Sequence, residues 1–77
     1  MGLKFDVVTP FAGRIKQVRV GLGEKTSVGE AIFTISASEG HYDILSPVTG
    51  MACSIEVEEG DEVIQGMILA TVKEQTE

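Results

Sequence analysis

The sequence predicts an all-β domain, a flattened β-barrel (a barrel-sandwich hybrid) made of two similar halves, with a central hairpin that protrudes from it. Three observations predict this fold. Residues 9–35 align without gaps on residues 46–72, at a constant offset of 37. Prolines and glycines recur at the same places in both copies. No segment shows the three- and four-residue spacing of apolar side chains that is typical of an amphipathic helix.

The repeat is a repeat of backbone geometry more than of side-chain chemistry. Glycine and proline mark places where the chain must turn or approach another strand closely, and they account for four of the six identities in 27 aligned positions. Two short β units that are each too small to bury an apolar face alone should pack together about a pseudo-two-fold axis. The identical pairs are Pro10/Pro47, Gly13/Gly50, Val20/Val57, Gly23/Gly60, Gly29/Gly66 and Thr34/Thr71.

In each half, a first short strand should end at a proline, Pro10 or Pro47, because proline cannot donate to a sheet ladder. Gly13 and Gly50 then turn the chain into a second strand. Its apolar positions fall at residues 15, 18 and 20, and again at 52, 55 and 57. A step of three followed by a step of two breaks strict alternation, and one extra residue in a β-bulge explains the break.

Acidic turns around Gly23 and Gly60 should follow, and then an apolar strand that begins after Gly29 or Gly66. Residues 36–45 join the halves and contain the small residues and glycine of a tight hairpin tip. We expect this hairpin to project from one end of the barrel, with the chain termini near the other. The chain has 77 residues, and we interpret residues 1–77 as a single domain.

Charge and composition argue against several classes of protein. The net charge is −6, with +3 over residues 1–25 and −9 over residues 26–77. No basic patch is large enough for nucleic acid, and no apolar run approaches the ~20 residues of a membrane span. We therefore expect a cytoplasmic protein with neither of these partners. The five acids of residues 56–62 are interpreted as a solubilising surface or, alternatively, as a docking face for a basic partner.

Over residues 5–72 the sequence resembles the biotinyl/lipoyl carrier domain family. "TPFAGRI" is similar to the opening Pro-x-x-Gly turn of that family, and "SPVTG" to the motif that follows its central hairpin. "GEKTSVGEAIFTI" and "GDEVIQGMILATV" are similar to its paired G-D-x-V-x-x-G-x-x-L segments. The resemblance implies a carrier fold whose hairpin tip presents a lysine, to which biotin or lipoate is attached as a swinging arm.

The spacing of the family places that modified position at Glu39, within "SASEG". A carboxylate cannot form the amide that anchors either cofactor, and the four lysines of the chain, at 4, 16, 25 and 73, lie outside the hairpin. We therefore expect no cofactor, although a lysine at position 39 would imply biotin or lipoate. The resemblance points to protein partners, such as subunits of a carboxylase or acyltransferase complex. The expected recognition hairpin is Ser38, Glu39, Gly40 and His41.

Three interpretations stay open. The chain is a naturally arm-less relative that acts through protein contacts, a true carrier whose lysine has been replaced, or a barrel-sandwich domain that never carried an arm. The first is the preferred prediction. Domains of the third kind occur, by family resemblance, inside transporter adaptors and other multidomain assemblies.

A metal-binding or enzymatic role is the alternative from a different class. Glu39, His41 and Asp43 are spaced by two, so a strand would place them on one face, where they could bind a metal. A polar outer face of an exposed hairpin explains the same pattern, and we predict no metal site. Cys53 aligns with Lys16 in the repeat and is expected to be an inert surface thiol. No catalytic residues are predicted, since a small barrel is filled by its own side chains and offers no cleft for paired carboxylates.

Overall fold

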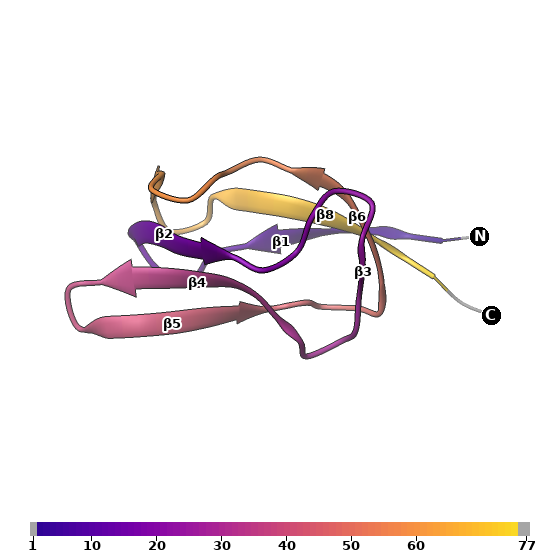
Figure 1. Ribbon diagram of the computed structural model, residues 1–77, viewed down its shortest axis with the longest axis horizontal. Helices are drawn as coiled ribbons and strands as arrows, with labels where there is room; N and C mark the ends of the chain where they lie inside the picture. The colour runs from indigo at the N-terminus through magenta and orange to yellow at the C-terminus, as the bar shows by residue number, and fades with distance from the viewer. Residues whose placement is uncertain (1, 76–77) are drawn as a thin grey trace.

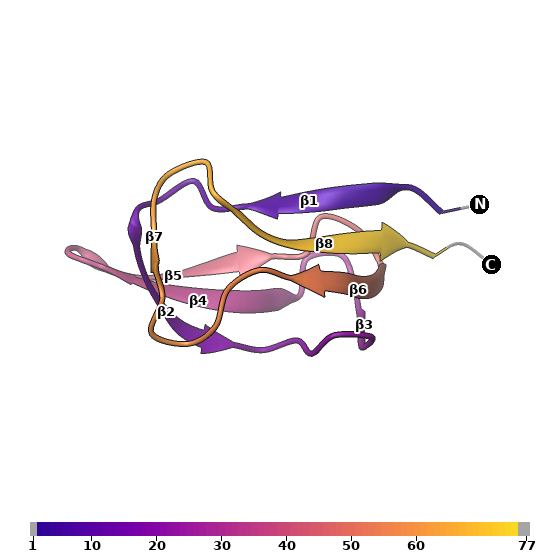
Figure 2. The same cartoon turned by 90° about the horizontal axis from the view of Figure 1, so that it is seen from above.

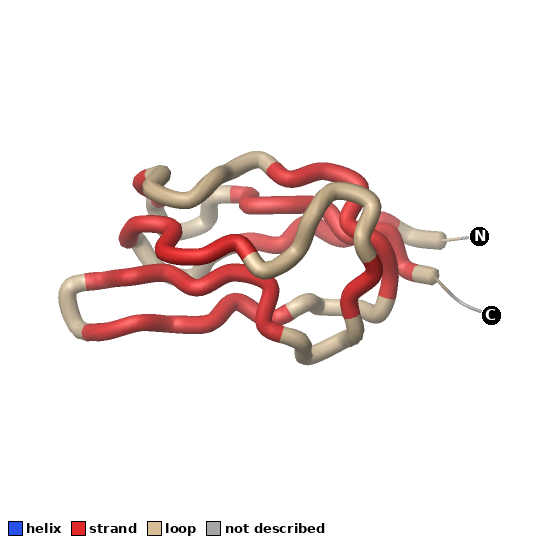
Figure 3. Tube along the Cα trace, viewed as in Figure 1, coloured by secondary structure: helices blue, strands red, loops and turns tan. Residues whose placement is uncertain are grey.

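The computed structural model describes residues 2–75 and contains only strands and loops in that range (Figure 3). There is accordingly no helix among those residues that could cross a membrane. The molecule is elongated, with extents of 41 × 19 × 19 Å. The eight strands are β1 (Lys4–Val8), β2 (Gly13–Val18), β3 (Lys25–Thr26), β4 (Ala31–Ala37), β5 (Gly40–Leu45), β6 (Gly50–Ile55), β7 (Glu62–Val63) and β8 (Ile68–Glu74).

The strands form two antiparallel sheets of four, in the orders β1-β8-β6-β3 and β5-β4-β2-β7. The counterparts across the repeat are β1 and β5, β2 and β6, β3 and β7, and β4 and β8. When each strand is replaced by its counterpart, the first strand order becomes the second. The two sheets are therefore related by the predicted pseudo-symmetry. The bounds of β6, β7 and β8 equal those of β2, β3 and β4 plus 37. Each half contributes its short strand, β3 or β7, to the sheet built mainly by the other half, and this exchange interlocks the halves.

Matching hydrogen bonds join the halves. The amide of Gly23 donates to the carbonyl of Ala52, and the amide of Gly60 donates to that of Ile15, both at 2.8 Å. The returning bonds, from Ile15 to Asp61 and from Ala52 to Glu24, also correspond across the repeat. Positive φ angles at Gly23, Gly29, Gly60 and Gly66 confirm that the repeated turn glycines specify backbone geometry.

The predicted bulges are present. The register between β2 and β4 shifts between Ile15 and Gln17, and the register between β6 and β8 shifts between Ala52 and Ser54. Lys16 and Cys53 are the residues at these shifts, which explains why both leave the core. The Cys53 thiol is half-buried, with Sγ 3.4 Å from the carbonyl oxygen of Thr71.

The first strands of the two halves end earlier than the prolines suggest, at Val8 and Leu45. A buried hydroxyl lies just after each strand. Thr9 Oγ1 donates to the carbonyl of Phe11, and Ser46 Oγ donates to that of Val48, both at 2.7 Å. The backbone of Thr9 and Ser46 still bonds to the opposite segment, with Thr9 N donating to the Met67 carbonyl and Ser46 N to the Glu30 carbonyl. The local hydroxyl bonds therefore fix the turn that carries each proline.

The core lies between the two sheets and is aliphatic except for one aromatic ring, that of Phe33. The strand β4 contributes most to it, with Ile32, Phe33 and Ile35 fully buried. The other buried apolar residues are Val7, Ile15, Val20, Ile44, Ala52, Val57, Val63, Leu69, Ala70 and Val72.

Candidate functional site

The hairpin of β4 and β5 protrudes from one end of the molecule, while β1 begins and β8 ends at the opposite end (Figures 1 and 2). Its strands pair from Ala31 opposite Leu45 out to Ala37 opposite Gly40. The tip is therefore only the two-residue turn Ser38-Glu39, shorter than the loop that the sequence suggests. Ser36 and Ala37 belong to β4.

Gly40 sets the backbone of this tip. It has φ of 142°, in a region that residues with a side chain rarely adopt, and no non-glycine residue among 2–75 has a positive φ. The two turn residues therefore cannot form a type I′ or II′ turn, since either type requires a positive φ at its first central residue. The chain reverses with ordinary conformations at Ser38 and Glu39, and Gly40 absorbs the unusual angle.

Glu39 lies at the exposed apex, as predicted. None of the side-chain hydrogen bonds or ion pairs found within residues 2–75 involves its carboxylate. Ser38 and His41 are exposed beside it. The apex thus presents a free negative charge at the position where the family resemblance implies a lysine.

The expected face of Glu39, His41 and Asp43 is only partly correct. His41 and Asp43 both face outward from β5, but Glu39 belongs to the turn, because β5 begins at Gly40. The two strand residues also have different partners. Lys16 Nζ lies 3.1 Å from His41 Nδ1, and the Thr34 hydroxyl donates to Asp43 at 3.0 Å. No group of three His, Cys, Asp or Glu residues within 2–75 could hold a metal ion, so the geometry gives the metal alternative no support.

Sequence reasoning missed the contact that supports the base of the hairpin. The ring of Phe11, from the loop between β1 and β2, stacks on the ring of Tyr42 in β5, with centroids 4.3 Å apart and planes inclined by 21°. Such a stack stabilises beyond the area that it buries. Phe11 aligns with Val48 in the repeat, so no recurring signal marked it.

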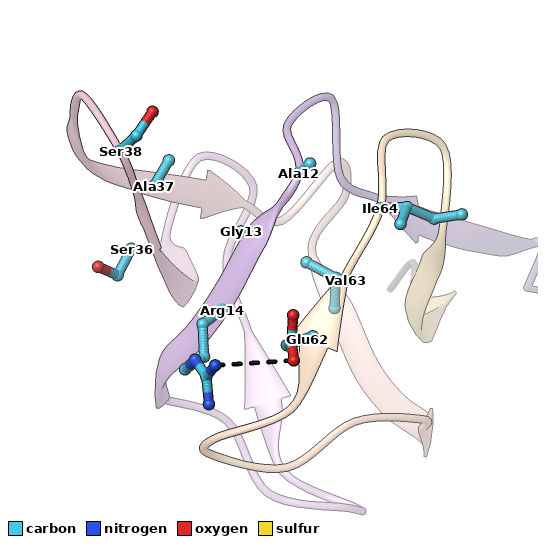
Figure 4. A pocket seen from close by; sticks show the side chains of 9 residues that line it. All are labelled: Ala12, Gly13, Arg14, Ser36, Ala37, Ser38, Glu62, Val63 and Ile64. Carbon is cyan, nitrogen blue, oxygen red and sulfur yellow. Dashed lines mark ion pairs between the residues drawn. The ribbon is translucent and has the colours of Figure 1, made fainter.

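An open depression of about 450 Å³ lies between the hairpin and β7 (Figure 4). The hairpin side is formed by Ser36, Ala37 and Ser38, and Val63 and Ile64 line the opposite side. Arg14 and Glu62 form an exposed ion pair at 3.7 Å along its lower end. Because both side chains are largely exposed, this pair contributes little to stability, and the charges are free to contact another molecule.

No protein-family model matches the chain. The chain is 27% identical, over 64 residues, to the dihydrolipoyllysine-residue acetyltransferase component of the pyruvate dehydrogenase complex from Mycoplasma genitalium. That alignment covers 83% of this chain and 17% of the relative.

Several solved structures share the fold, among them the following two. One is the urea carboxylase of Kluyveromyces lactis, with a TM-score of 0.84, 18% identity, and coverage of 91% of this chain and 6% of that chain. The other is the succinylglutamate desuccinylase/aspartoacylase of Rhodobacter sphaeroides, with a TM-score of 0.75, 22% identity, and coverage of 94% and 22%. The chain therefore spans less than a quarter of the length of each of these three proteins.

An all-β sandwich of two interlocked halves with a projecting hairpin is the architecture expected of a carrier-type domain. The chain is thus similar in sequence to the acetyltransferase component and in fold to the urea carboxylase, and both similarities agree with the resemblance to the biotinyl/lipoyl carrier family.

Proposed function

We propose that this chain is a non-catalytic, carrier-like domain that acts through protein–protein contacts and bears Glu39 at the position of the usual modified lysine. The observation that carries the proposal is an exposed carboxylate at the apex of an otherwise intact hairpin. The relative in a pyruvate dehydrogenase complex and the urea carboxylase with the same fold suggest an acyl- or carboxyl-transfer complex as the setting.

The residues at the tip do not fit biotin or lipoate. Both cofactors are attached through an amide to a lysine amine, and a glutamate carboxylate cannot supply that amine. Lys16 comes near the hairpin but lies in β2, with its ammonium group against His41. We therefore expect neither cofactor to be attached at this tip.

The tip and the adjacent depression offer a surface suited to another protein. The depression combines a charged end, Arg14 and Glu62, with the exposed apolar side chain of Ile64. Such a mixture of charged and apolar groups is typical of a non-obligate protein interface. The Phe11–Tyr42 stack holds the hairpin base, so a partner would meet a preformed shape and lose little binding energy in ordering it.

Attempted modification tests the absence of the arm. We expect the wild-type chain to gain no mass when it is produced with a biotin ligase or a lipoate ligase and the matching cofactor. Intact-protein mass spectrometry is the measurement. A cofactor mapped to Lys4, Lys16, Lys25 or Lys73 would contradict the proposal.

The substitution Glu39→Lys distinguishes a lost arm from one that never existed. Since Glu39 is exposed and lacks side-chain bonds within residues 2–75, the change should alter the free energy of unfolding by no more than about 0.5 kcal/mol. Partial biotinylation or lipoylation of this variant would favour the replaced-lysine carrier, and a folded, unmodified variant would favour a domain specialised for contacts. A large loss of stability would show that the tip has been assigned wrongly.

A barrel-sandwich domain that never carried a cofactor arm is a second candidate, because the desuccinylase/aspartoacylase shares the fold. A photo-crosslinking residue at Ser38 separates the candidates by the identity of the captured protein, with the same residue at exposed Leu22 as control. Capture of a carboxylase or acyltransferase subunit from the source cells, at Ser38 only, supports the proposed function. Equal capture from both positions argues against recognition by the hairpin.

A further inference from the structure

A row of basic residues crosses the outer face of the β1-β8-β6-β3 sheet. Lys4 pairs with Lys73, Lys73 pairs with Met51, and Met51 pairs with Lys25. Residues directly opposite in antiparallel strands project to the same face. The three lysines and the half-buried Met51 between them therefore share one surface, called here the lysine row. It lies on the strand ends near the termini, away from the hairpin (Figures 1 and 2).

No ion pair found within residues 2–75 involves a lysine of this row. Lys4 and Lys73 stand directly opposite each other, an arrangement of like charges that is unfavourable in a sheet. The ion pair found within residues 2–75 is Arg14–Glu62, in the other sheet. Asp6, two residues from Lys4 on the same face, instead accepts a hydrogen bond from the Thr71 hydroxyl at 3.2 Å.

Protection of sheet edges explains only part of the row. Lysines on edge strands deter pairing with other chains, and Lys4 and Lys25 lie on the edge strands β1 and β3. Lys73 lies on β8, which is hydrogen-bonded on both sides, by β1 and β6. An interior strand has no free edge, so edge protection does not explain the presence of Lys73.

The pseudo-symmetric row in the other sheet strengthens this contrast. It consists of His41, Ser36, Arg14 and Glu62, paired in the same order across β5, β4, β2 and β7. There the guanidinium is paired with a carboxylate at 3.7 Å. The two equivalent rows of the fold thus differ in charge, and the lysine row has charged side chains of one sign.

We propose that the lysine row docks an acidic segment of a partner protein, with carboxylates over the lysines and an apolar side chain over Met51. Charge complementarity selects this occupant. Four strands spaced ~4.8 Å apart span about 14 Å, enough for a few carboxylates. The net charge of −6 opposes association with long polyanions such as nucleic acid or an anionic membrane. Because the row lies away from the hairpin, both surfaces can be occupied at once.

The test is an NMR titration of the ¹⁵N-labelled protein with a capped oligoglutamate peptide that carries one central leucine, at an ionic strength of about 0.15 M, where the Debye length is about 8 Å. We expect amide shift changes centred on Lys4, Lys25, Met51 and Lys73. A triple variant, Lys4→Gln/Lys25→Gln/Lys73→Gln, should weaken binding about fivefold or more, since exposed ion pairs are individually weak but three are removed. The variant's own spectrum shows whether it is folded.

The chain has three other basic residues, which provide a control of equal charge: Arg14→Gln/Lys16→Gln/Arg19→Gln. This control should weaken binding less than about twofold, since general attraction of exposed charges is largely screened. Equal weakening by both triples would overturn the proposal, because only net charge would then matter. So would stronger binding of an oligothymidylate or of phosphatidylserine vesicles, or row-dependent self-association in analytical ultracentrifugation. Failure of this test leaves the proposed hairpin function intact, because the two surfaces are separate.

Discussion

At the scale of single residues, the hairpin tip depends on two neighbours with different roles. Glu39 has a free side chain, so its identity affects what the tip can bind or carry and has little effect on folding. Gly40 has φ of 142° and open space where a Cβ would stand. Its contribution is conformational, because the turn before it uses ordinary backbone angles.

The substitution Gly40→Ala tests that contribution. The Cβ would meet no atom within 4 Å, so its cost should come from the backbone alone, at about 1 to 3 kcal/mol. Urea unfolding of the variant and the wild type measures the difference.

Gly13→Ala is the contrasting control, since its Cβ would lie 2.5 Å from the carbonyl oxygen of Ser36. That contact is with backbone, which cannot move aside easily, and we expect a loss at least as large as that of Gly40→Ala. If Gly40→Ala keeps full stability, the tip has another accessible turn geometry and the argument for Gly40 is wrong.

At the scale of elements, the two halves differ in the turn before their last strand. In the first half, the Glu30 carboxylate accepts hydrogen bonds from the Ser27 amide at 2.8 Å and the Thr26 hydroxyl at 3.0 Å. The Ser27 bond, and then the Thr26 bond, hold the pKa of Glu30 below its usual value. Met67 occupies the equivalent position in the second half and cannot do the same.

This contact predicts a particular pH dependence. A carboxylate whose pKa is lowered by folding stabilises the folded state above its unfolded pKa, near 4.5, and that contribution is lost as the pH falls through the folded pKa. The melting temperature of Glu30→Gln should therefore fall less steeply than that of the wild type below about pH 4.5.

Thermal unfolding at several pH values between neutral and acid measures both slopes. Glu39→Gln is the matched control, because it removes one carboxylate that has no side-chain bond within residues 2–75. Identical slopes for Glu30→Gln and the wild type would show that the turn contact does not affect acid stability.

At the scale of the whole molecule, exchange of β3 and β7 between the sheets makes the halves dependent on each other. The repeat is regular in its backbone, but the core side chains are not. Phe33 and Ala70 are equivalent positions, as are Ile15 and Ala52, and all four are buried. The first half supplies the larger side chain at both pairs. At these positions it therefore fills more of the core than the second half does.

The substitution Phe33→Ala should therefore unfold much of the protein. Removal of a buried phenylalanine costs about 3 to 5 kcal/mol, comparable with the ~3–5 kcal/mol that a core of this size supplies. Far-UV circular dichroism and urea unfolding at 25 °C measure the effect.

Phe11→Ala is the control on the outside of the barrel, where the ring is 38% exposed. We expect it to cost less and to loosen the base of the hairpin instead. A Phe33→Ala protein with a wild-type melting temperature would contradict the assignment of Phe33 to the centre of the core.

Much of the fold could be read from the repeat. The recurring prolines and glycines predicted the turns and the strands after Gly13, Gly29, Gly50 and Gly66, and the family resemblance implied the position of Glu39 at the tip. The broken alternation at residues 15, 18 and 20 predicted the bulge that the register between β2 and β4 confirms. Such features depend on local backbone preference and on apolar periodicity, which neighbouring residues specify by themselves.

The sequence alone therefore determined the two halves, their turns, the hairpin and the absence of lysine from its tip. Only the tertiary structure decided which half each short strand joins, that Phe11 meets Tyr42, and that Lys4, Lys25 and Lys73 form one row. These contacts join residues far apart in the chain, and their partners follow from strand register across the sheets. Register across a sheet is a property of the packed molecule, since hydrogen bonds and shared burial select it among many pairings that the sequence would allow.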